Sequence, residues 1–252
     1  METRSTRFSG YVTPKLIETA TVTISGCGAI GRQVAMQLAS MGVRDFTLID
    51  PDTIDESNLG TQGWSPCDLG KDKTAVLSDE LLARNPQIHT INTVSLAPKV
   101  VCSSGDVERL DNAHEFVCVD SMDVRREIFE AARGSRHIQS RARTLYDTRM
   151  GLNACRVLCC KDIEDDQAAA EYEATLFSSA EAEQAPCTMK STIYCANIAA
   201  GLAVSRFIEM LRASEGRIDT CFIESDVQMN IPGNLMFTGT PELQEKKEVQ
   251  NA

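Results

Sequence analysis

Three glycines, Gly26, Gly28 and Gly31, have the spacing of a loop that binds the phosphates of a nucleotide. They form the pattern GCGAIG between an apolar run and a segment of helical spacing. Such glycines allow a tight turn and let backbone N–H groups approach a phosphate, and the following helix adds the positive end of its dipole. Asp50 ends the next apolar run, where a carboxylate can accept hydrogen bonds from ribose hydroxyls. These four residues together predict a nucleotide site.

Polar side chains that suit a triphosphate follow in the chain. Asn58 and Gln62 lie just beyond the second apolar run, Lys71 and Lys73 begin a helical pattern, and Asp120 ends another strand pattern. A lysine can neutralise phosphate charge, and a strand-end aspartate can hold Mg²⁺. An NAD-dependent oxidoreductase needs no such pair, so these residues favour ATP. The alternative for each is a surface lysine or a helix-capping aspartate.

Cys187 has surroundings that suit a nucleophile. It lies just before a helical pattern, and both Lys190 and a helix N-terminus would favour its thiolate. The preceding residues 162–186 hold eight acids and no lysine or arginine, which is typical of a solvated loop or a partner surface. The alternative is a helix cap made by Thr188 or Ser191, with Cys187 incidental.

The other cysteines do not indicate a metal or disulfide framework. The chain has ten cysteines but no C-x-x-C pair, and only three histidines, so we expect no structural zinc. The N-terminus carries no apolar signal-peptide core, which predicts a reducing, cytoplasmic setting with free thiols.

Charge and length narrow the class of protein. The net charge of −11 argues against a nucleic-acid partner, and the absence of a run of about 18 apolar residues predicts no membrane span. A chain of 252 residues is long enough for one large α/β domain or two small ones.

The order of elements predicts the fold of the first half. Strand patterns and helix patterns alternate, with strands expected at 20–31, 44–52, 89–97 and 115–120, and helices at 32–42, within 67–86 and at 124–134. This order predicts a Rossmann-like, doubly wound α/β fold whose sheet is largely parallel.

The second half departs from that alternation. We expect an N-terminal arm or helix over 1–18 and further strands at 156–160, 220–229 and 234–238. A crossover loop over 162–190 should lead into a late helix at 191–211, and the tail over 240–252 should be frayed.

The ordered set of motifs resembles the ThiF/MoeB/HesA adenylyltransferases, the bacterial relatives of ubiquitin-activating enzymes. The set comprises the glycine loop, Asp50, N-L-x-x-Q at 58–62, G-x-x-K at 70–73 and D-x-x-x-x-R at 120–125, and it covers roughly residues 7–212. The resemblance implies one adenylation domain over 1–252, which uses ATP and Mg²⁺. Its reaction would adenylate the C-terminal glycine of a ubiquitin-like or sulfur-carrier protein and release pyrophosphate.

The resemblance also implies roles and partners. Gly26, Gly28 and Gly31 would cradle the nucleotide, Asp50 would bind the ribose, Asn58, Gln62 and Lys73 would meet the phosphates, Asp120 would ligate Mg²⁺, and Cys187 would form a thioester. A homodimer is expected, and a conjugating enzyme is a possible further partner.

Two positions depart from the family pattern. Thr61 stands where the family has an arginine of N-L-x-R-Q, and Gly10 replaces a second arginine near the N-terminus. Arg141, Arg143 and Arg149 could compensate at the nucleotide, or could simply pair with nearby acids. Three other functions therefore stay open: a weakened scaffold subunit beside an active homologue, adenylation of a tRNA base, and an NAD-dependent oxidoreductase.

Overall fold

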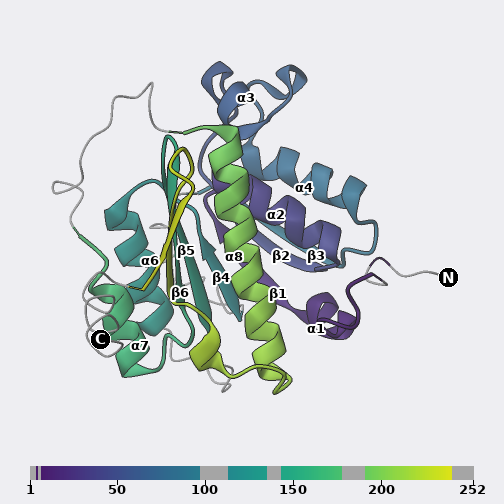
Figure 1. Cartoon of the computed structure of the whole chain (residues 1–252). Coiled ribbons are helices and arrows are strands. Elements are labelled where there is room, and N and C mark those ends of the chain that lie inside the picture. Colours follow the sequence, from purple (N-terminus) through teal and green to yellow (C-terminus); the bar gives the residue numbers. More distant parts are fainter. Residues whose placement is uncertain (1–3, 5–6, 97–112, 135–142, 178–190, 240–252) are drawn as a thin grey trace.

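The computed structural model describes residues 4, 7–96, 113–134, 143–177 and 191–239, and these form one sheet of eight strands in the order β3-β2-β1-β4-β5-β6-β7-β8 (Figure 1). The strands are β1 Thr21–Ser25, β2 Asp45–Ile49, β3 Thr90–Val94, β4 His114–Val117, β5 Thr144–Gly151, β6 Ala154–Cys160, β7 Asp226–Asn230 and β8 Leu235–Thr238.

The sheet is parallel from β3 to β5 and antiparallel from β5 to β8. The chain runs outward from β1 to β2 and β3, then returns to place β4 on the other side of β1. A ligand crevice in such a sheet forms beyond the carboxyl ends of the strands where this reversal occurs. The ends of β1 and β4 are therefore the expected place for a bound nucleotide.

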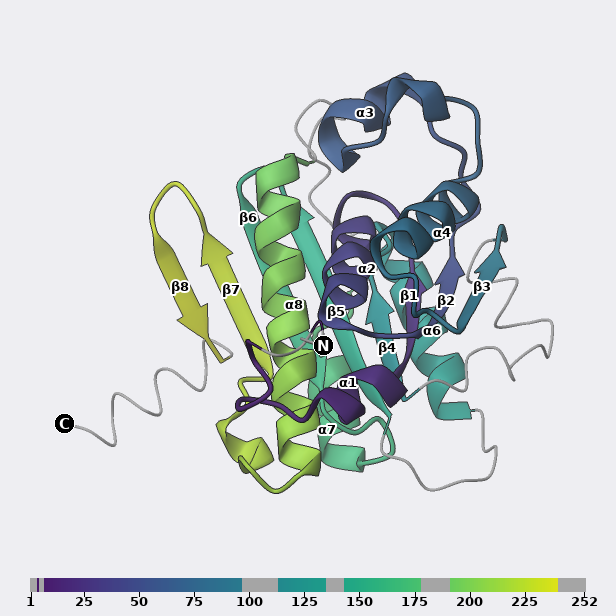
Figure 2. The same cartoon turned by 90° about the vertical axis from the view of Figure 1, so that its right-hand side faces the viewer.

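Helices cover both faces of the sheet (Figure 2). They are α1 Pro14–Thr19, α2 Ala29–Met41, α3 Glu56–Gln62, α4 Lys73–Arg84, α6 Met122–Gly134, α7 Asp166–Glu173 and α8 Ile193–Ser214, with short 3₁₀ turns at Pro66–Asp68 and Thr220–Phe222. One core cluster joins α2, α4 and α8 to the sheet, and a second joins α6 and α7 to its other face. The predicted doubly wound α/β architecture is confirmed.

The long helix α8 is apolar because it lies in the core. By length and composition it could cross a membrane, but it packs along α2, β5 and β6, and its alanines Ala199 and Ala203 are fully buried. Small side chains allow the helix to approach the sheet closely. Burial inside the fold accounts for its hydropathy.

The structure differs from the sequence expectations at four places. Helix α3 and strand β5 were not expected, and the strand expected over 220–229 begins only at Asp226. The acidic segment expected as a crossover loop begins with helix α7. Ala169 and Tyr172 of that helix are buried, and Asp165 caps it by accepting a hydrogen bond from the Ala168 N–H. Its acids occupy the solvent side of a helix that packs on the sheet.

Candidate nucleotide site

Two of the three loop glycines are required by the fold itself. Gly26 has a φ of +94°, and a Cβ there would lie 2.8 Å from the carbonyl oxygen of Cys118. A Cβ on Gly31 would overlap the carbonyl oxygen of Gly26 and lie 3.2 Å from the Cys118 Cβ. These two glycines let the ends of β1 and β4 and the first turn of α2 pack together.

Gly28 is different, because an added Cβ would make only ordinary van der Waals contacts there. It is the N-cap of α2, and the nearest atom to an added Cβ would be Nε2 of Gln62, at 3.7 Å. No protein contact requires glycine at this position. A bare backbone at the N-terminus of a helix is what a phosphate needs for close approach. The arrangement fits the predicted phosphate contact.

Asp50 lies directly beneath the glycine loop. Its Oδ2 accepts a hydrogen bond from the Cys27 backbone N–H at 2.6 Å, and its Oδ1 accepts one from the Asp52 N–H at 2.8 Å. Burial raises the pKa of this carboxyl, while the two N–H groups and the nearby Lys73 oppose the rise. Each oxygen keeps a further acceptor site, which fits the predicted contact with ribose hydroxyls.

Lys73 is the first residue of α4 and supplies a buried cation beside Asp50. Its Nζ donates to Asp52 Oδ2 at 2.8 Å, and its backbone N–H donates to the Asp52 carbonyl. The lysine side chain is 5% exposed while that of Asp52 is 63% exposed. The cation therefore shares its charge with a carboxylate that faces solvent.

Helix α3, which carries Asn58 and Gln62, lies above α2 (Figure 2). Asn58 forms a reciprocal capping box with Asp55, so its amide is used in starting the helix. Gln62 is the last residue of α3 and lies over Gly28. Between them, Thr61 donates its hydroxyl to the Ser57 carbonyl at 3.1 Å, a contact within the helix that brings no positive charge to the site.

Asp120 is exposed in the turn between β4 and α6, next to the glycine loop. The buried Arg125 holds this turn by donating to the carbonyl oxygens of Val117 and Val119. The same guanidinium pairs with Asp147, and burial lowers the pKa of Arg125 to about 10. The D-x-x-x-x-R motif thus works as a pair, in which the arginine fixes the backbone that presents the aspartate.

Arg149 lies two strands away from the glycine loop and is held by other groups. It donates to Asp147 Oδ2 at 2.7 Å and to the carbonyl oxygen and hydroxyl of Thr175. Tyr172 donates to the same carboxylate oxygen at 3.1 Å. Of the two roles open from the sequence, the structure shows pairing with an acid, and the nucleotide contact stays a prediction.

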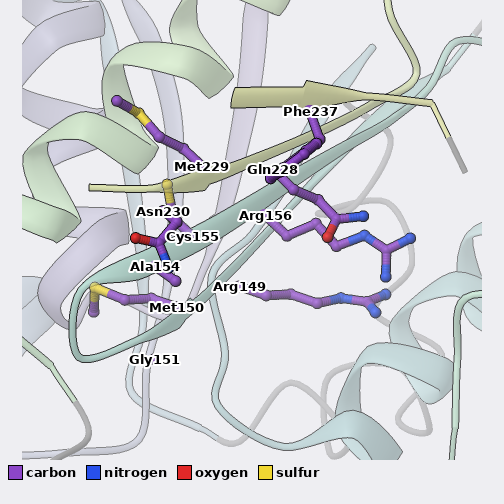
Figure 3. A pocket seen from close by; sticks show the side chains of 10 residues that line it. All are labelled: Arg149, Met150, Gly151, Ala154, Cys155, Arg156, Gln228, Met229, Asn230 and Phe237. Atoms are coloured by element: carbon purple, nitrogen blue, oxygen red, sulfur yellow. The ribbon is translucent and has the colours of Figure 1, made fainter. Parts of the chain in front are cut away.

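A cavity of about 380 Å³ lies over the antiparallel strands rather than at the glycine loop. In Figure 3 the side chains of Arg149, Arg156 and Gln228 extend to the same side of the sheet. Phe237 on β8 also lines this cavity, and Arg156 forms a two-pronged ion pair with Asp226 at 2.7–2.9 Å. The cavity wall is therefore a mixture of aromatic and paired charged groups.

Several expectations lie outside the described residues, namely those for Cys187, Arg141 and the tail 240–252. Arg143 is described at the start of β5, where it donates to the Ala132 carbonyl. Within the described ranges no group of three His, Cys, Asp or Glu side chains is placed to hold a metal. Mg²⁺ commonly uses one or two carboxylates together with substrate phosphates, and Asp120 fits that requirement.

Sequence reasoning missed three residues that shape the site: Asp52, Trp64 and Asp147. Asp52 stands two residues after Asp50, and this short spacing was available as a sign. Trp64 and Asp147 gave no such sign, because their partners are the side chain of Gln62 and two arginines brought together by the fold.

Comparison with known proteins places this geometry in a family. The model of the ThiF family matches residues 4–247. The crystal structure of E. coli MccB with AMPCPP and selenomethionine MccA superposes with a TM-score of 0.70 at 18% identity, covering 95% of this chain and 71% of that one. At that identity the similarity shows the fold.

Curated relatives match part of the sequence. The probable adenylyltransferase/sulfurtransferase MoeZ of Mycobacterium tuberculosis is 34% identical over 86 residues, which are 33% of this chain and 22% of MoeZ. The molybdopterin-synthase adenylyltransferase of E. coli K12 is 33% identical over 110 residues, 42% of each chain. This chain thus matches less than half the length of either relative. Because the family model spans nearly all of it, the chain belongs to the ThiF family.

Proposed function

We propose that this protein is an ATP-dependent adenylyltransferase that activates the C-terminal carboxylate of a protein or peptide. The observation that carries the proposal is Gly28. It is a glycine that no protein contact requires, at a helix N-terminus, with Asp50, Lys73 and Asp120 around it. The names of the relatives and the MccB complex with AMPCPP agree with a nucleotide substrate.

Each residue of the site would bind the part of the nucleotide that matches its charge. The α2 N-terminus and Gln62 donate hydrogen bonds to phosphate oxygens, and Asp50 holds the ribose. Lys73 adds positive charge, and Asp120 would hold Mg²⁺, which when bound neutralises phosphate charge. A carboxylate oxygen of the substrate then attacks the α-phosphorus, so that an acyl-adenylate forms and pyrophosphate leaves. The acyl-adenylate is a far better acyl donor than a carboxylate.

The cavity over the antiparallel strands is our proposed path for the substrate's last residues. Neighbouring strands lie about 4.8 Å apart, so β5 and β6 are roughly 10–15 Å from the glycine loop on β1. About four extended residues span that distance at ~3.3 Å each. A flexible C-terminal tail, as in a ubiquitin-like or sulfur-carrier protein, fits this requirement. In the MccB crystal the companion of AMPCPP is MccA.

The finer parts of the function stay proposals on the family resemblance. These are thioester formation on Cys187, a homodimer, and a conjugating enzyme as partner. A cytoplasmic location stays a proposal too, on the composition of the N-terminal segment. Replacement of Cys187 by alanine should preserve pyrophosphate exchange and abolish a thiol-sensitive adduct with the carrier. An adduct that survives the replacement would exclude the role.

Calorimetric titration with ATP·Mg²⁺ and, separately, with NAD⁺ tests the nucleotide. We expect ATP to bind and Asp120→Ala to weaken that binding about tenfold or more, because a Mg²⁺ ligand is removed. The matched control is Asp123→Ala, which removes the same charge from an exposed position in the first turn of α6. Binding of NAD⁺ alone would overturn the proposal and restore the oxidoreductase alternative.

A scaffold subunit is the second candidate, and Thr61 favours it. The side chain that replaces the family arginine bonds within its own helix and brings no cation to the phosphates. A scaffold would bind ATP without exchanging pyrophosphate in the presence of any carrier. Measured exchange would exclude it.

A further inference from the structure

The amide of Gln62 has its orientation set by Trp64, the only tryptophan of the chain. The indole Nε1 donates a hydrogen bond to Gln62 Oε1 at 2.9 Å. An indole N–H can only donate, so the amide oxygen must face it. The amide nitrogen is then left to donate, and it lies next to Gly28, 3.7 Å from a Cβ placed on that residue, with Oε1 at 3.9 Å from the same point.

Trp64 is itself buried and lies beneath the side chain of Arg32. It is 4% exposed, and the Arg32 guanidinium lies over its ring, 4.8 Å from the centroid. Arg32 is fixed by two hydrogen bonds to Glu80 of α4, at 2.7 and 3.1 Å. Through these contacts, residues of α2 and α4 together fix the orientation of the indole ring.

The backbone next to Gln62 is fixed as well. The Gln62 carbonyl accepts hydrogen bonds from Arg32 and from Gln33, both at 3.4 Å. Gly63 follows with a φ of +79°, and a Cβ there would lie 3.1 Å from Ile193 of α8 and 3.3 Å from Arg32 Nη1. The end of α3 is thus clamped between α2 and α8, and the side-chain amide is the part left to turn.

From this geometry we infer that Trp64 is a positioning residue for the nucleotide, acting through Gln62. Phosphate oxygens only accept hydrogen bonds, so an amide that presents its oxygen to them is repelled and one that presents its NH₂ binds. Trp64 binds the amide oxygen and so leaves the NH₂ of the same amide to donate above the glycine loop before the nucleotide arrives. The inference rests on the proposed nucleotide site at Gly28.

The test is a double-mutant cycle on ATP·Mg²⁺ affinity with Trp64→Phe, Gln62→Met and both changes together. Phenylalanine keeps an aromatic ring beneath Arg32 but lacks the N–H, and methionine keeps the length of Gln62 but lacks the amide. We expect Trp64→Phe to weaken binding about three- to tenfold, the usual cost of ordering one long side chain on binding. In the Gln62→Met background the same change should have no further effect.

Each outcome of the cycle decides the matter. Equal losses in the two backgrounds would show that Trp64 acts as a packing residue alone and would overturn the inference, as would unchanged affinity of the Trp64→Phe variant. If the wild type does not bind ATP·Mg²⁺ at all, it is the proposed function that fails, and the positioning role fails with it.

A second measurement leaves Trp64 intact, in case Trp64→Phe does not fold. A single tryptophan gives a single indole N–H resonance in a ¹⁵N-correlated spectrum. In the ligand-free wild type we expect slow exchange of this proton with solvent, and about tenfold or faster exchange in Gln62→Met. The resonance should also shift on addition of ATP·Mg²⁺. Identical exchange in the two proteins, or no shift at saturating nucleotide, would refute the inference.

Discussion

Replacement of Gly31 or Gly28 by alanine should separate the folding role of the glycine loop from its binding role. The two glycines are three residues apart, and each change adds one methyl group. At Gly31 that group would overlap the carbonyl oxygen of Gly26, whereas at Gly28 the nearest protein atom would be 3.7 Å away. The same chemical change therefore clashes with backbone at one position and makes an ordinary side-chain contact at the other.

The expected loss of stability in Gly31→Ala follows from the backbone shift that the added methyl group requires. Because a carbonyl oxygen of the backbone cannot rotate aside, α2 must shift relative to β1, and overpacking of this kind costs about 3 kcal/mol. Alanine at an interior helix position returns about 1 kcal/mol through its better helix propensity. The net loss of about 2 kcal/mol should lower the Tm of a chain this size by roughly 4–8 °C. For Gly28→Ala we expect a Tm close to that of the wild type.

The assay is thermal unfolding of the three proteins, followed by calorimetric titration with ATP·Mg²⁺. Gly28→Ala should keep the wild-type Tm and bind ATP about tenfold or more weakly, since its methyl group stands where the phosphate must approach. Gly31→Ala should show a lower Tm. A wild-type Tm for Gly31→Ala, or full ATP affinity for Gly28→Ala, would refute the reasoning.

Three further predictions concern charges. Asp147→Asn should lower the free energy of unfolding in a urea titration by about 3–5 kcal/mol, because it leaves two arginines without their shared carboxylate. The control is Arg133→Ala, which removes an exposed ion pair and should lower the same free energy by at most about 0.5 kcal/mol. Burial raises the pKa of Glu115 to about 7, so its protonated form stabilises the fold below about pH 4.5 and that contribution is lost as the pH rises to 7. The Tm of the wild type should therefore fall between pH 5 and 7 relative to Glu115→Gln, and parallel curves would contradict this. Thr61→Arg should raise the rate of pyrophosphate exchange about tenfold or more if the missing cation limits catalysis; an unchanged rate would show that it does not.

Local sequence was sufficient for the parallel half of the fold. Alternating apolar runs and helical spacing predicted β1 to β4 and the helices α2, α4 and α6, because their periodicity reflects burial on the two faces of the sheet. Helix α3 was missed because its apolar face is short. Helix α7 was missed because its surroundings are rich in acids and only two side chains of the helix itself are buried. Acidic composition reports solvent exposure, and an exposed helix face is as acidic as a loop.

The candidate site was likewise predictable from the sequence only in part. The residue types and spacing of the glycine loop, Asp50, Lys73 and Asp120 were sufficient to predict that they meet, since the carboxyl ends of parallel strands share one edge. Which arginine serves the phosphates could not be predicted. The role of Arg149 depends on Asp147 and on Thr175, which lies 26 residues further along the chain.

The sequence by itself determined where the loop lies between strand and helix, because glycine spacing and strand periodicity act over a few residues. Only the tertiary structure decided that Gly31 is enclosed while Gly28 has room for a Cβ, and that the Gln62 amide oxygen is bound by Trp64. Those properties depend on contacts between residues far apart in the chain, such as the pair of Arg32 and Glu80. Local spacing carries no information about the packing that brings such residues together.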